Sequence, residues 1–356
     1  MSNLPQSMKA VILKKVEGKP GIVYHNLELA NLPLPKVQDG QVLVKLHAAA
    51  LNHREVFIRQ YGILGADGAG LVVSPASHHL FNKPVLISSG VGWKSSTYGP
   101  DASYEYGILG GSRQTGGRGT FAEFIAVEDV VPCPAHLLSE KTGWEEAAAL
   151  PLAALTAYRA VFTKAEIEKG QNVLITGIGG GVAIQALQFA IAAGATAFVT
   201  SGQTDKIERA KKMGAAGGVN YKEDDWPKKL QAMLPQDRPY LDAVIDSAGG
   251  NITSLLVRIL KHGARVSVYG QTTGKPHIMT MGECLKNIEI RGSTMGSFEE
   301  FKAAIAFIEK HKIRPVIHKT ILGLENAEDA FRIMKDGEQF GKLVIKISNE
   351  SPSSKL

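Results

Sequence analysis

The sequence has very little cysteine. Only Cys133 and Cys284 occur in 356 residues. This scarcity excludes a disulfide framework and a structural zinc site built on four cysteines. The excess of one charge sign is also small. The chain has 40 Lys and Arg residues and 34 Asp and Glu residues, which gives a net charge of +6, and its basic residues form no long block. The mild excess suits an anionic ligand but does not by itself predict binding to nucleic acid.

Apolar residues are plentiful, yet we expect no membrane span. They make up 44% of the chain, which is enough to bury a core and argues against disorder or a coiled coil. The stretch Val173–Thr200 carries no charge and is long enough to cross a bilayer. Its glycines, however, divide it into strand, turn, helix and strand. The first residues, Met1–Lys9, are polar and lack the apolar core of a secretory signal.

The sequence ends in Ser354-Lys355-Leu356, which has the form of a peroxisomal targeting signal. A chance tripeptide is the alternative. The polar Ser351-Pro352-Ser353 before it suits an accessible tail. We therefore expect a peroxisomal import receptor to bind this tail, with the cytoplasm as the alternative location.

The pattern of expected strands and helices divides the chain into two parts. The first third is β-rich, and a long connection at 88–119, rich in Gly, Ser and Tyr, interrupts it. Further along, strands alternate with helices, which is typical of a parallel, doubly wound sheet. The expected strands lie at 8–14, 41–49, 70–73, 120–127, 172–176, 197–201, 241–246, 264–269, 288–291, near 316 and at 343–347. The fold class is therefore α/β, with a β domain and a doubly wound domain.

A glycine-rich turn follows the strand expected at 172–176. It reads Gly177-Ile178-Gly179-Gly180-Gly181-Val182 and precedes an expected helix at 182–193. Residues without side chains let the backbone approach a pyrophosphate, and the helix N-terminus offers N–H groups and a partial positive charge. A flexible glycine turn is the alternative, and the spacing departs from Gly-x-Gly-x-x-Gly at Ala183. The flanking strand and helix favour a dinucleotide site formed by Gly177, Gly179, Gly180, Gly181 and Val182.

The residues after the next strand predict which dinucleotide binds. An NAD site usually has Asp or Glu there to bind the ribose 2′-OH. This chain has Ser201-Gly202-Gln203, followed by Lys206 and Arg209. A hydroxyl and cations suit a 2′-phosphate, although a solvated helix face is the alternative role for the two cations. We therefore predict NADP(H), with Ser201 and Lys206 at the phosphate.

Several further segments carry a resemblance to a known family. They are Ala49–Glu55, Gly65–Gly70, Gly119–Phe124, Ala149–Tyr158 and Asp246–Gly250. Together with the glycine turn, they make nearly the whole chain resemble the medium-chain dehydrogenase/reductase superfamily. The most similar branches are the quinone oxidoreductases and the "zinc-type alcohol dehydrogenase-like" proteins.

The resemblance implies a GroES-like catalytic domain and a Rossmann NADP(H)-binding domain. The first comprises residues 1–135 and 305–356, and the second residues 136–304. By analogy with relatives, it also implies a homodimer joined at sheet edges near Ile288–Thr294.

Comparison with zinc-dependent relatives predicts that this chain binds no zinc. Those relatives have a cysteine where Asn52 stands, Gly-His-Glu where this chain has Gly65-Ala66-Asp67, and a second catalytic cysteine near Leu152. Asn, Ala and Leu cannot replace thiolate and imidazole ligands. The segment Gly92–Gly119, which matches the lobe with four structural cysteines, contains none. We therefore expect neither catalytic nor structural zinc.

Without zinc, an alcohol oxygen lacks its Lewis acid, whereas hydride addition to a quinone or a polarised C=C bond needs a donor near the developing oxyanion and a dry pocket. The expected function is therefore an NADPH-dependent, zinc-independent reductase of quinones or α,β-unsaturated carbonyls. Asn52 is the expected oxyanion-facing donor. Tyr61 is a second candidate, with a packed loop aromatic as its alternative role.

Two other functions stay open. One is an alcohol dehydrogenase of other specificity, which the missing zinc ligands argue against. The other is a non-catalytic protein that binds nucleotides or RNA, although no RNA-recognition motif is present.

The resemblance implies further cofactor contacts. Thr156 would meet the nicotinamide, Tyr221 would pack near the adenosine phosphate, and Gly270 and Thr272 would border a ribose. Lys342, in Phe340-Gly341-Lys342, resembles a late Gly-Lys turn that reaches the cofactor. Asp246 has a structural role in this interpretation, at a strand end.

Overall fold

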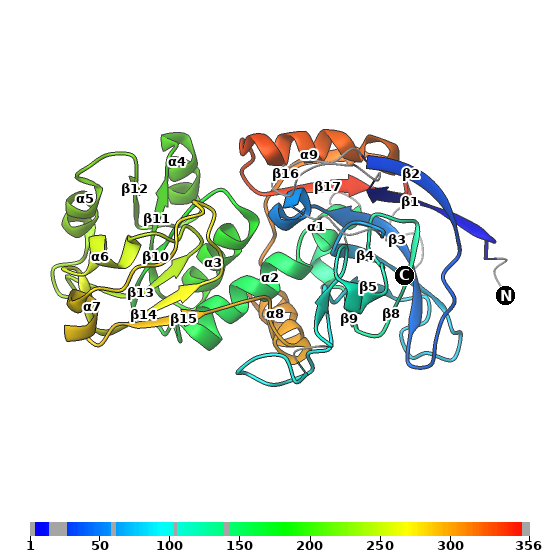
Figure 1. Cartoon of the computed structure of the whole chain (residues 1–356), viewed down its shortest axis with the longest axis horizontal. Helices are drawn as coiled ribbons and strands as arrows, with labels where there is room; N and C mark the ends of the chain where they lie inside the picture. Colours follow the sequence, from blue (N-terminus) through cyan, green and yellow to red (C-terminus); the bar gives the residue numbers. More distant parts are fainter. Residues whose placement is uncertain (1–3, 14–26, 58–61, 103–104, 139–142, 351–356) are drawn as a thin grey trace. The chain divides into compact units, whose positions relative to one another are not determined.

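The computed structural model describes residues 4–13, 27–57, 62–102, 105–138 and 143–350. The chain divides into two compact units (Figure 1). Unit 1 comprises Met1–Ala153 and Ser297–Leu356, and unit 2 comprises Ala154–Gly296. In the part of the chain that the structure describes, every helix is too short or too polar to cross a membrane.

Unit 1 is built on a seven-stranded sheet. Its order is β16-β17-β3-β4-β5-β9, with β8 paired to β3. All pairs are antiparallel except β16 with β17. The strands are β3 (Val42–Ala50), β4 (Asp67–Ser74), β5 (Pro84–Ile87), β8 (Phe124–Val127), β9 (Val130–Pro132), β16 (Ile317–Leu322) and β17 (Lys342–Lys346). The two-stranded pairs are β1 (Ser7–Leu13) with β2 (Leu27–Pro33), and β6 (Gly90–Val91) with β7 (Gly107–Ile108).

Unit 1 also contains helices. They are η1 (His53–Phe57), η2 (Arg113–Thr115), η3 (Ala135–Leu137), α1 (Gly143–Ala148), α8 (Phe298–His311), η5 (Leu324–Asn326) and α9 (Ala327–Asp336). Of these helices, α1 and α9 contact the strands of this sheet. Helix α9 buries Phe331 and Met334 in a hydrophobic core that also contains Leu51 and Ile345. Helix α8 begins with a capping box, in which the side chains of Ser297 and Glu300 each accept the other residue's backbone N–H.

The unit boundaries differ from the predicted ones at 135/136 and 304/305. Residues 143–153 belong to unit 1 because α1 packs on β3 and β4. Residues 297–304 belong there because the N–H groups of Phe298 and Glu299 donate to the carbonyls of Trp93 and Lys94, at 2.9 and 3.0 Å. These tertiary contacts decide the boundary, and the strand and helix pattern does not contain them.

Unit 2 contains a six-stranded parallel sheet of order β12-β11-β10-β13-β14-β15. The strands are β10 (Asn172–Ile175), β11 (Thr196–Ser201), β12 (Gly217–Asn220), β13 (Leu241–Asp246), β14 (Leu260–Val268) and β15 (Glu289–Gly292). The helices are α2 (Pro151–Tyr158), which begins in unit 1, η4 (Arg159–Lys164), α3 (Gly181–Ala192), α4 (Thr204–Lys212), α5 (Trp226–Met233), α6 (Ile252–Leu256) and α7 (Met281–Leu285). The predicted α/β class with a doubly wound parallel sheet is therefore confirmed.

The strand order of unit 2 locates a ligand-binding edge. Strands β10 and β13 are neighbours at the centre of the sheet. The strands that follow β10, namely β11 and β12, lie on one side, and those that follow β13, namely β14 and β15, lie on the other. In open parallel sheets, ligands bind beyond the carboxyl ends of the strands at this point. The glycine turn follows β10 directly, so the fold puts it at this edge.

Candidate active site

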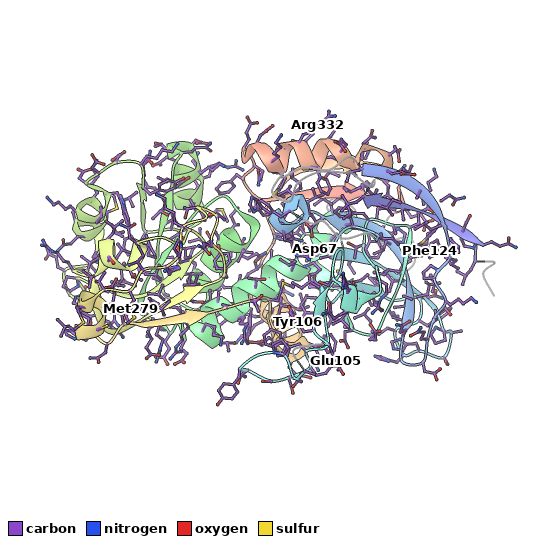
Figure 2. The ribbon with its side chains drawn as sticks, viewed as in Figure 1. Asp67, Glu105, Tyr106, Phe124, Met279 and Arg332 are labelled. Atoms are coloured by element: carbon purple, nitrogen blue, oxygen red, sulfur yellow. The ribbon has the colours of Figure 1, made fainter. Side chains whose placement is uncertain are left out.

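Asn52 of unit 1 stands between β3 and η1. Ala50 of β3 pairs with Asp67 of β4, which brings the side chain of Asn52 to the start of that neighbouring strand. Asn52 is 7% exposed and Asp67 is fully buried. Figure 2 shows Asp67 among the strands of unit 1. The sheet register therefore buries a polar cluster that no local motif places together.

The side-chain amide of Asn52 lies between the Asp67 carboxylate and the Lys342 ammonium. Its Nδ2 donates to Asp67 Oδ2 at 2.9 Å. The buried Lys342 ammonium donates to Asn52 Oδ1 and to Asp67 Oδ2, each at 2.7 Å. A lysine ammonium only donates and a carboxylate only accepts, so these neighbours allow a single orientation of the Asn52 amide.

The second oxygen of Asp67 fastens two other segments to the cluster. Oδ1 accepts the backbone N–H of Leu152 at 2.7 Å and the hydroxyl of Ser89 at 3.2 Å. The buried carboxylate therefore has a cation and hydrogen-bond donors around it, as a buried charge requires.

Glu55 is the second acid of this region. Its carboxylate accepts the backbone N–H of Asn52, and the residue is 2% exposed. Burial raises the pKa of Glu55 to about 7; the charge of Asp67 adds to this rise, while the cations Arg54 and Lys342 oppose it. Arg54 also donates to the carbonyl of Leu109 at 2.9 Å.

The predicted residues of unit 1 have different outcomes. The structure brings Asn52 and Lys342 together, whereas Tyr61 lies outside the described residues. Lys342 was predicted to bind cofactor, but its contacts place it in the Asn52 cluster, so cofactor binding by Lys342 stays a prediction. Sequence reasoning missed Asp67 and Glu55 as site residues. The available signal for Asp67 was one acid within a run of small apolar residues at 65–70.

In the glycine turn of unit 2, the backbone angles of two glycines would be strained for any other residue. Gly177 and Gly179 have φ angles of 66° and 130°. A Cβ atom on Gly179 would lie 2.9 Å from Cδ of Lys206. Helix α3 then begins at Gly181, and its N-cap, Gly180, supplies no side-chain acceptor for the first N–H groups. A close-approaching turn below such a helix N-terminus fits a phosphate group.

Ser201 and Lys206 lie beside this turn. Thr200, at the end of β11, accepts the N–H of Gly177 on its hydroxyl at 3.2 Å, which fastens that strand end to the turn. Ser201 follows directly and is 5% exposed. Lys206 is 8% exposed, and its Nζ lies 3.5 Å from the position of a Cβ on Gly179. The turn therefore has a hydroxyl and a cation next to it.

Tyr221 and Lys222 complete this end of the site. A Cβ on Gly202 would lie 2.9 Å from Tyr221 Oη and 2.8 Å from Lys222 Cε, so both side chains lie over Gly202, next to Ser201. The sequence predicted Tyr221 and missed Lys222, whose signal was its place directly after Tyr221. The described groups around Gly202 fit a sugar phosphate better than a bare ribose hydroxyl.

The remaining predicted residues of unit 2 surround Ser247. Thr272 donates to the Ser247 carbonyl through N–H at 2.9 Å and through its hydroxyl at 3.1 Å. A Cβ on Gly270 would lie 3.2 Å from the same oxygen, and one on Gly177 would lie 3.0 Å from Ser247 Oγ. Gly270 and Thr272 are therefore linked to the glycine turn through one serine. Thr156 lies in α2, where its hydroxyl contacts Met295 Sδ at 3.7 Å.

Asp246 has the structural role predicted for it. Its carboxylate accepts the Thr176 hydroxyl at 2.7 Å and the N–H of Gly249 at 2.9 Å, and His277 Nε2 lies 3.0 Å away. It is fully buried at the end of β13. These bonds fix the loop that follows this strand, and they occupy both carboxylate oxygens with partners inside the protein.

The residues at the three positions that match zinc ligands in zinc-dependent relatives do not fit a zinc ion. Asn52, the buried Ala66 and Leu152 offer no thiolate or imidazole ligand. Across the residues that the structure describes, no three His, Cys, Asp or Glu side chains gather as a ligand set.

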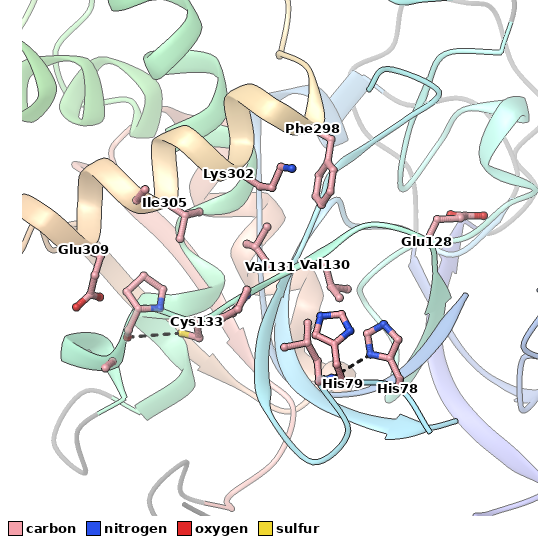
Figure 3. A pocket seen from close by; sticks show the side chains of 15 residues that line it. His78, His79, Glu128, Val130, Val131, Cys133, Phe298, Lys302, Ile305 and Glu309 are labelled. Atoms are coloured by element: carbon pink, nitrogen blue, oxygen red, sulfur yellow. Dashed lines mark hydrogen bonds between the residues drawn. The ribbon is translucent and has the colours of Figure 1, made fainter. Parts of the chain in front are cut away.

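A separate pocket of about 610 Å³ lies in unit 1 between α8 and β9 (Figure 3). Val131, Ile305 and Phe298 give it apolar walls, and Cys133 lines it. Burial and the charge of Glu309 raise the pKa of the Cys133 thiol, so this thiol stays protonated and unreactive. The pocket contains none of the predicted site residues, and we assign it no chemistry.

Comparison with known proteins places the chain in a family. Residues 181–310 match the family described as "Zinc-binding dehydrogenase". The "Zinc-type alcohol dehydrogenase-like protein YogA" of Leptosphaeria maculans is 41% identical over 355 residues, covering 94% of this chain and 98% of the relative. The "Quinone oxidoreductase" of Mus musculus is 28% identical and covers 89% and 92%. A crystal structure of an "NAD-dependent alcohol dehydrogenase" is 30% identical, with a TM-score of 0.81 and coverage of 96% and 100%.

The fold and these similarities define the class: the chain belongs to the medium-chain dehydrogenase/reductase superfamily, a group of oxidoreductases. The resemblance drawn from the sequence motifs is confirmed. Within the superfamily, it is similar both to zinc-type alcohol dehydrogenase-like proteins and to quinone oxidoreductases.

Proposed function

We propose that this oxidoreductase is an NADPH-dependent reductase that adds hydride to a quinone or an α,β-unsaturated carbonyl without zinc. The observation that carries the proposal is the contact set of Asn52. At the position of a zinc-ligating thiolate in zinc-dependent relatives, a neutral amide is held between Lys342 and Asp67. An amide in this setting binds zinc poorly but donates a hydrogen bond well.

The proposed reaction requires the protein to position the substrate and to stabilise the negative charge that develops on its oxygen. When bound, NADPH supplies the hydride. An enone accepts this hydride at its β-carbon, the C=C electron pair moves toward oxygen, and the enolate then takes a proton on the α-carbon from water or a side chain. The Asn52 N–H stabilises the negative charge that develops on the oxygen.

The preference for NADPH over NADH is supported by the end of β11. Residues 201–203 are Ser, Gly and Gln, none of which is an acid that would repel a 2′-phosphate. Lys206 beside the turn and Lys222 over Gly202 add positive charge. The quinone oxidoreductase relative supports the acceptor class.

An alcohol dehydrogenase is the second candidate, because the 30% identical structure is an "NAD-dependent alcohol dehydrogenase". The two are separated by an assay of purified protein against enones, quinones, aldehydes and alcohols, with either coenzyme and with a zinc chelator present. Consumption of NADPH by an enone or a quinone that survives the chelator supports the proposal. Turnover confined to alcohols and aldehydes and lost to the chelator supports the alternative.

A further inference from the structure

We infer that Lys342 is a positioning residue for the proposed reduction: its ammonium, fixed by Asp67, holds the Asn52 amide in the orientation that presents an N–H to the substrate oxygen. The inference rests on the proposed function, because it assigns a role within the same site.

The fold places Lys342 rigidly. It begins β17, which pairs with β3 so that Val344 lies opposite Ala50. Its own N–H donates to the Val316 carbonyl at 2.8 Å. Gly341 before it has a φ of 108°, and a Cβ there would lie 2.3 Å from the same carbonyl oxygen, so only glycine fits. The backbone therefore directs a long side chain into the sheet edge where Asn52 lies.

The contacts admit one amide orientation. With Oδ1 toward Lys342 and Nδ2 toward Asp67, both neighbours are satisfied at 2.7 and 2.9 Å. A flipped amide would put NH₂ against an ammonium and a carbonyl against a carboxylate, and both contacts would be repulsive. The amide nitrogen carries two hydrogens, and Asp67 uses one of them. The other is the donor that we assign to the substrate oxygen.

The charges of Lys342 and Asp67 both act on this donor. A cation on the carbonyl oxygen of an amide draws electron density from its nitrogen, and hydrogen bonds in such a chain polarise one another. Lys342 is 5% exposed, so water screens its charge little. The Asp67 carboxylate on the same amide nitrogen opposes this effect, so the main contribution of Lys342 is the fixed orientation of the Asn52 amide.

The test compares Lys342→Met, Lys342→Arg, Asn52→Ala and the double variant Lys342→Met/Asn52→Ala. Lys346→Met is the matched control, because it removes an ion pair of the same strand, with Glu145 at 3.0 Å, away from the cluster. Since Lys342→Met leaves Asp67 unpaired, Asp67→Asn/Lys342→Met provides a second variant that removes both buried charges.

The kinetic outcomes are specific. We expect Lys342→Met to lower kcat about 10- to 100-fold, with KM and the Kd for NADPH within about twofold, and Lys342→Arg to restore most of the loss. We expect Lys342→Met to have little further effect in the Asn52→Ala background, because the lysine acts through the asparagine. The inference would be overturned if the kcat losses of Lys342→Met and Asn52→Ala multiplied fully in the double variant. It would also be overturned if Lys342→Met changed only the Kd for NADPH.

A spectroscopic measurement keeps the test independent of turnover. In protein labelled with ¹⁵N-asparagine, the side-chain amide signal of Asn52 is the one that Asn52→Ala removes. We expect this signal to shift and its hydrogens to exchange faster in Lys342→Met and in Asp67→Asn/Lys342→Met, but not in Lys346→Met. An unchanged signal would refute the role of Lys342. If the wild-type protein reduces none of the acceptors, the proposed function fails, and the amide signal still decides the role of Lys342.

Discussion

Asp67 and Lys342 form an ion pair at 2.7 Å although 275 residues separate them in the sequence. Their side chains are 0% and 6% exposed. The pair joins β4 to β17 across β3 and surrounds the amide of Asn52. Stability and the proposed chemistry therefore depend on the same buried charges.

Breaking this pair will destabilise the protein. Asp67→Asn leaves the Lys342 ammonium buried without its counter-charge, which costs about 3–5 kcal/mol of unfolding free energy. Asp67→Asn/Lys342→Met will recover part of that loss, because no unpaired charge remains. Urea unfolding measures both. A double variant less stable than Asp67→Asn would contradict this account.

Glu55 makes stability depend on pH. Burial raises the pKa of Glu55 to about 7 from its ordinary value of 4.5. Because the folded state holds this proton more tightly than the unfolded state, stability falls as pH rises from 4.5 through 7 and then levels off. Glu55→Gln, which keeps an acceptor for the Asn52 N–H, removes this term. We expect its stability relative to the wild type to rise by up to about 1.4 kcal/mol per pH unit in that window. Parallel stability curves would show that Glu55 does not titrate there.

The glycine turn can be tested with a matched pair of glycines. Gly179→Ala adds a Cβ 2.9 Å from Lys206 at a φ of 130°, whereas Gly263→Ala adds one at a φ of 71° with nothing within 4 Å. Both substitutions strain the backbone, by about 1–2 kcal/mol. We expect only Gly179→Ala to weaken NADPH binding, by about tenfold or more, as measured by fluorescence titration. Equal affinity in the two variants would place the phosphates elsewhere.

In the proposed function, the preference for NADPH over NADH depends on cations near β11. We expect Lys206→Met and Lys222→Met each to raise the Kd for NADPH about tenfold and to change the Kd for NADH much less, because only NADPH carries the 2′-phosphate. Lys211→Met is the control, since that lysine pairs with Glu208 on the exposed side of the same helix, α4. Equal losses for both coenzymes would assign the two lysines to the diphosphate instead.

The location of the protein can be tested through its tail, which lies outside the described residues. A fluorescent fusion that preserves Ser354-Lys355-Leu356 at the C-terminus will colocalise with a peroxisomal marker, and removal of Leu356 will release it to the cytosol. Peroxisomal fluorescence that persists without Leu356 would discount this signal.

The sequence predicted unit 2 well because its signals are local. Each central strand is an apolar run that precedes a turn and a helix, and the glycine turn after β10 needs no distant partner. In unit 1, β2, β5, β6, β7 and β9 were missed, and the last four of these have only two to four residues, which show no period. The edge strand β12 of unit 2 was missed as well, because two of its four residues are glycine.

The candidate site was predictable only in part for a related reason. Asn52 and Ser201 were found from their positions in motifs. The clustering of Lys342 with Asn52, and of Lys222 with Gly202, depends on sheet pairing over long sequence separations, which no local pattern encodes.

The central claim is hydride transfer from NADPH to carbon without a metal. The most direct test incubates metal-stripped protein with NADPH that carries deuterium at both C4 positions and a simple enone, followed by mass spectrometry of the product. We predict a saturated ketone with deuterium on the β-carbon, formed at the same rate when zinc is added. Deuterium absent from the product, or turnover that appears only with zinc, would contradict the account.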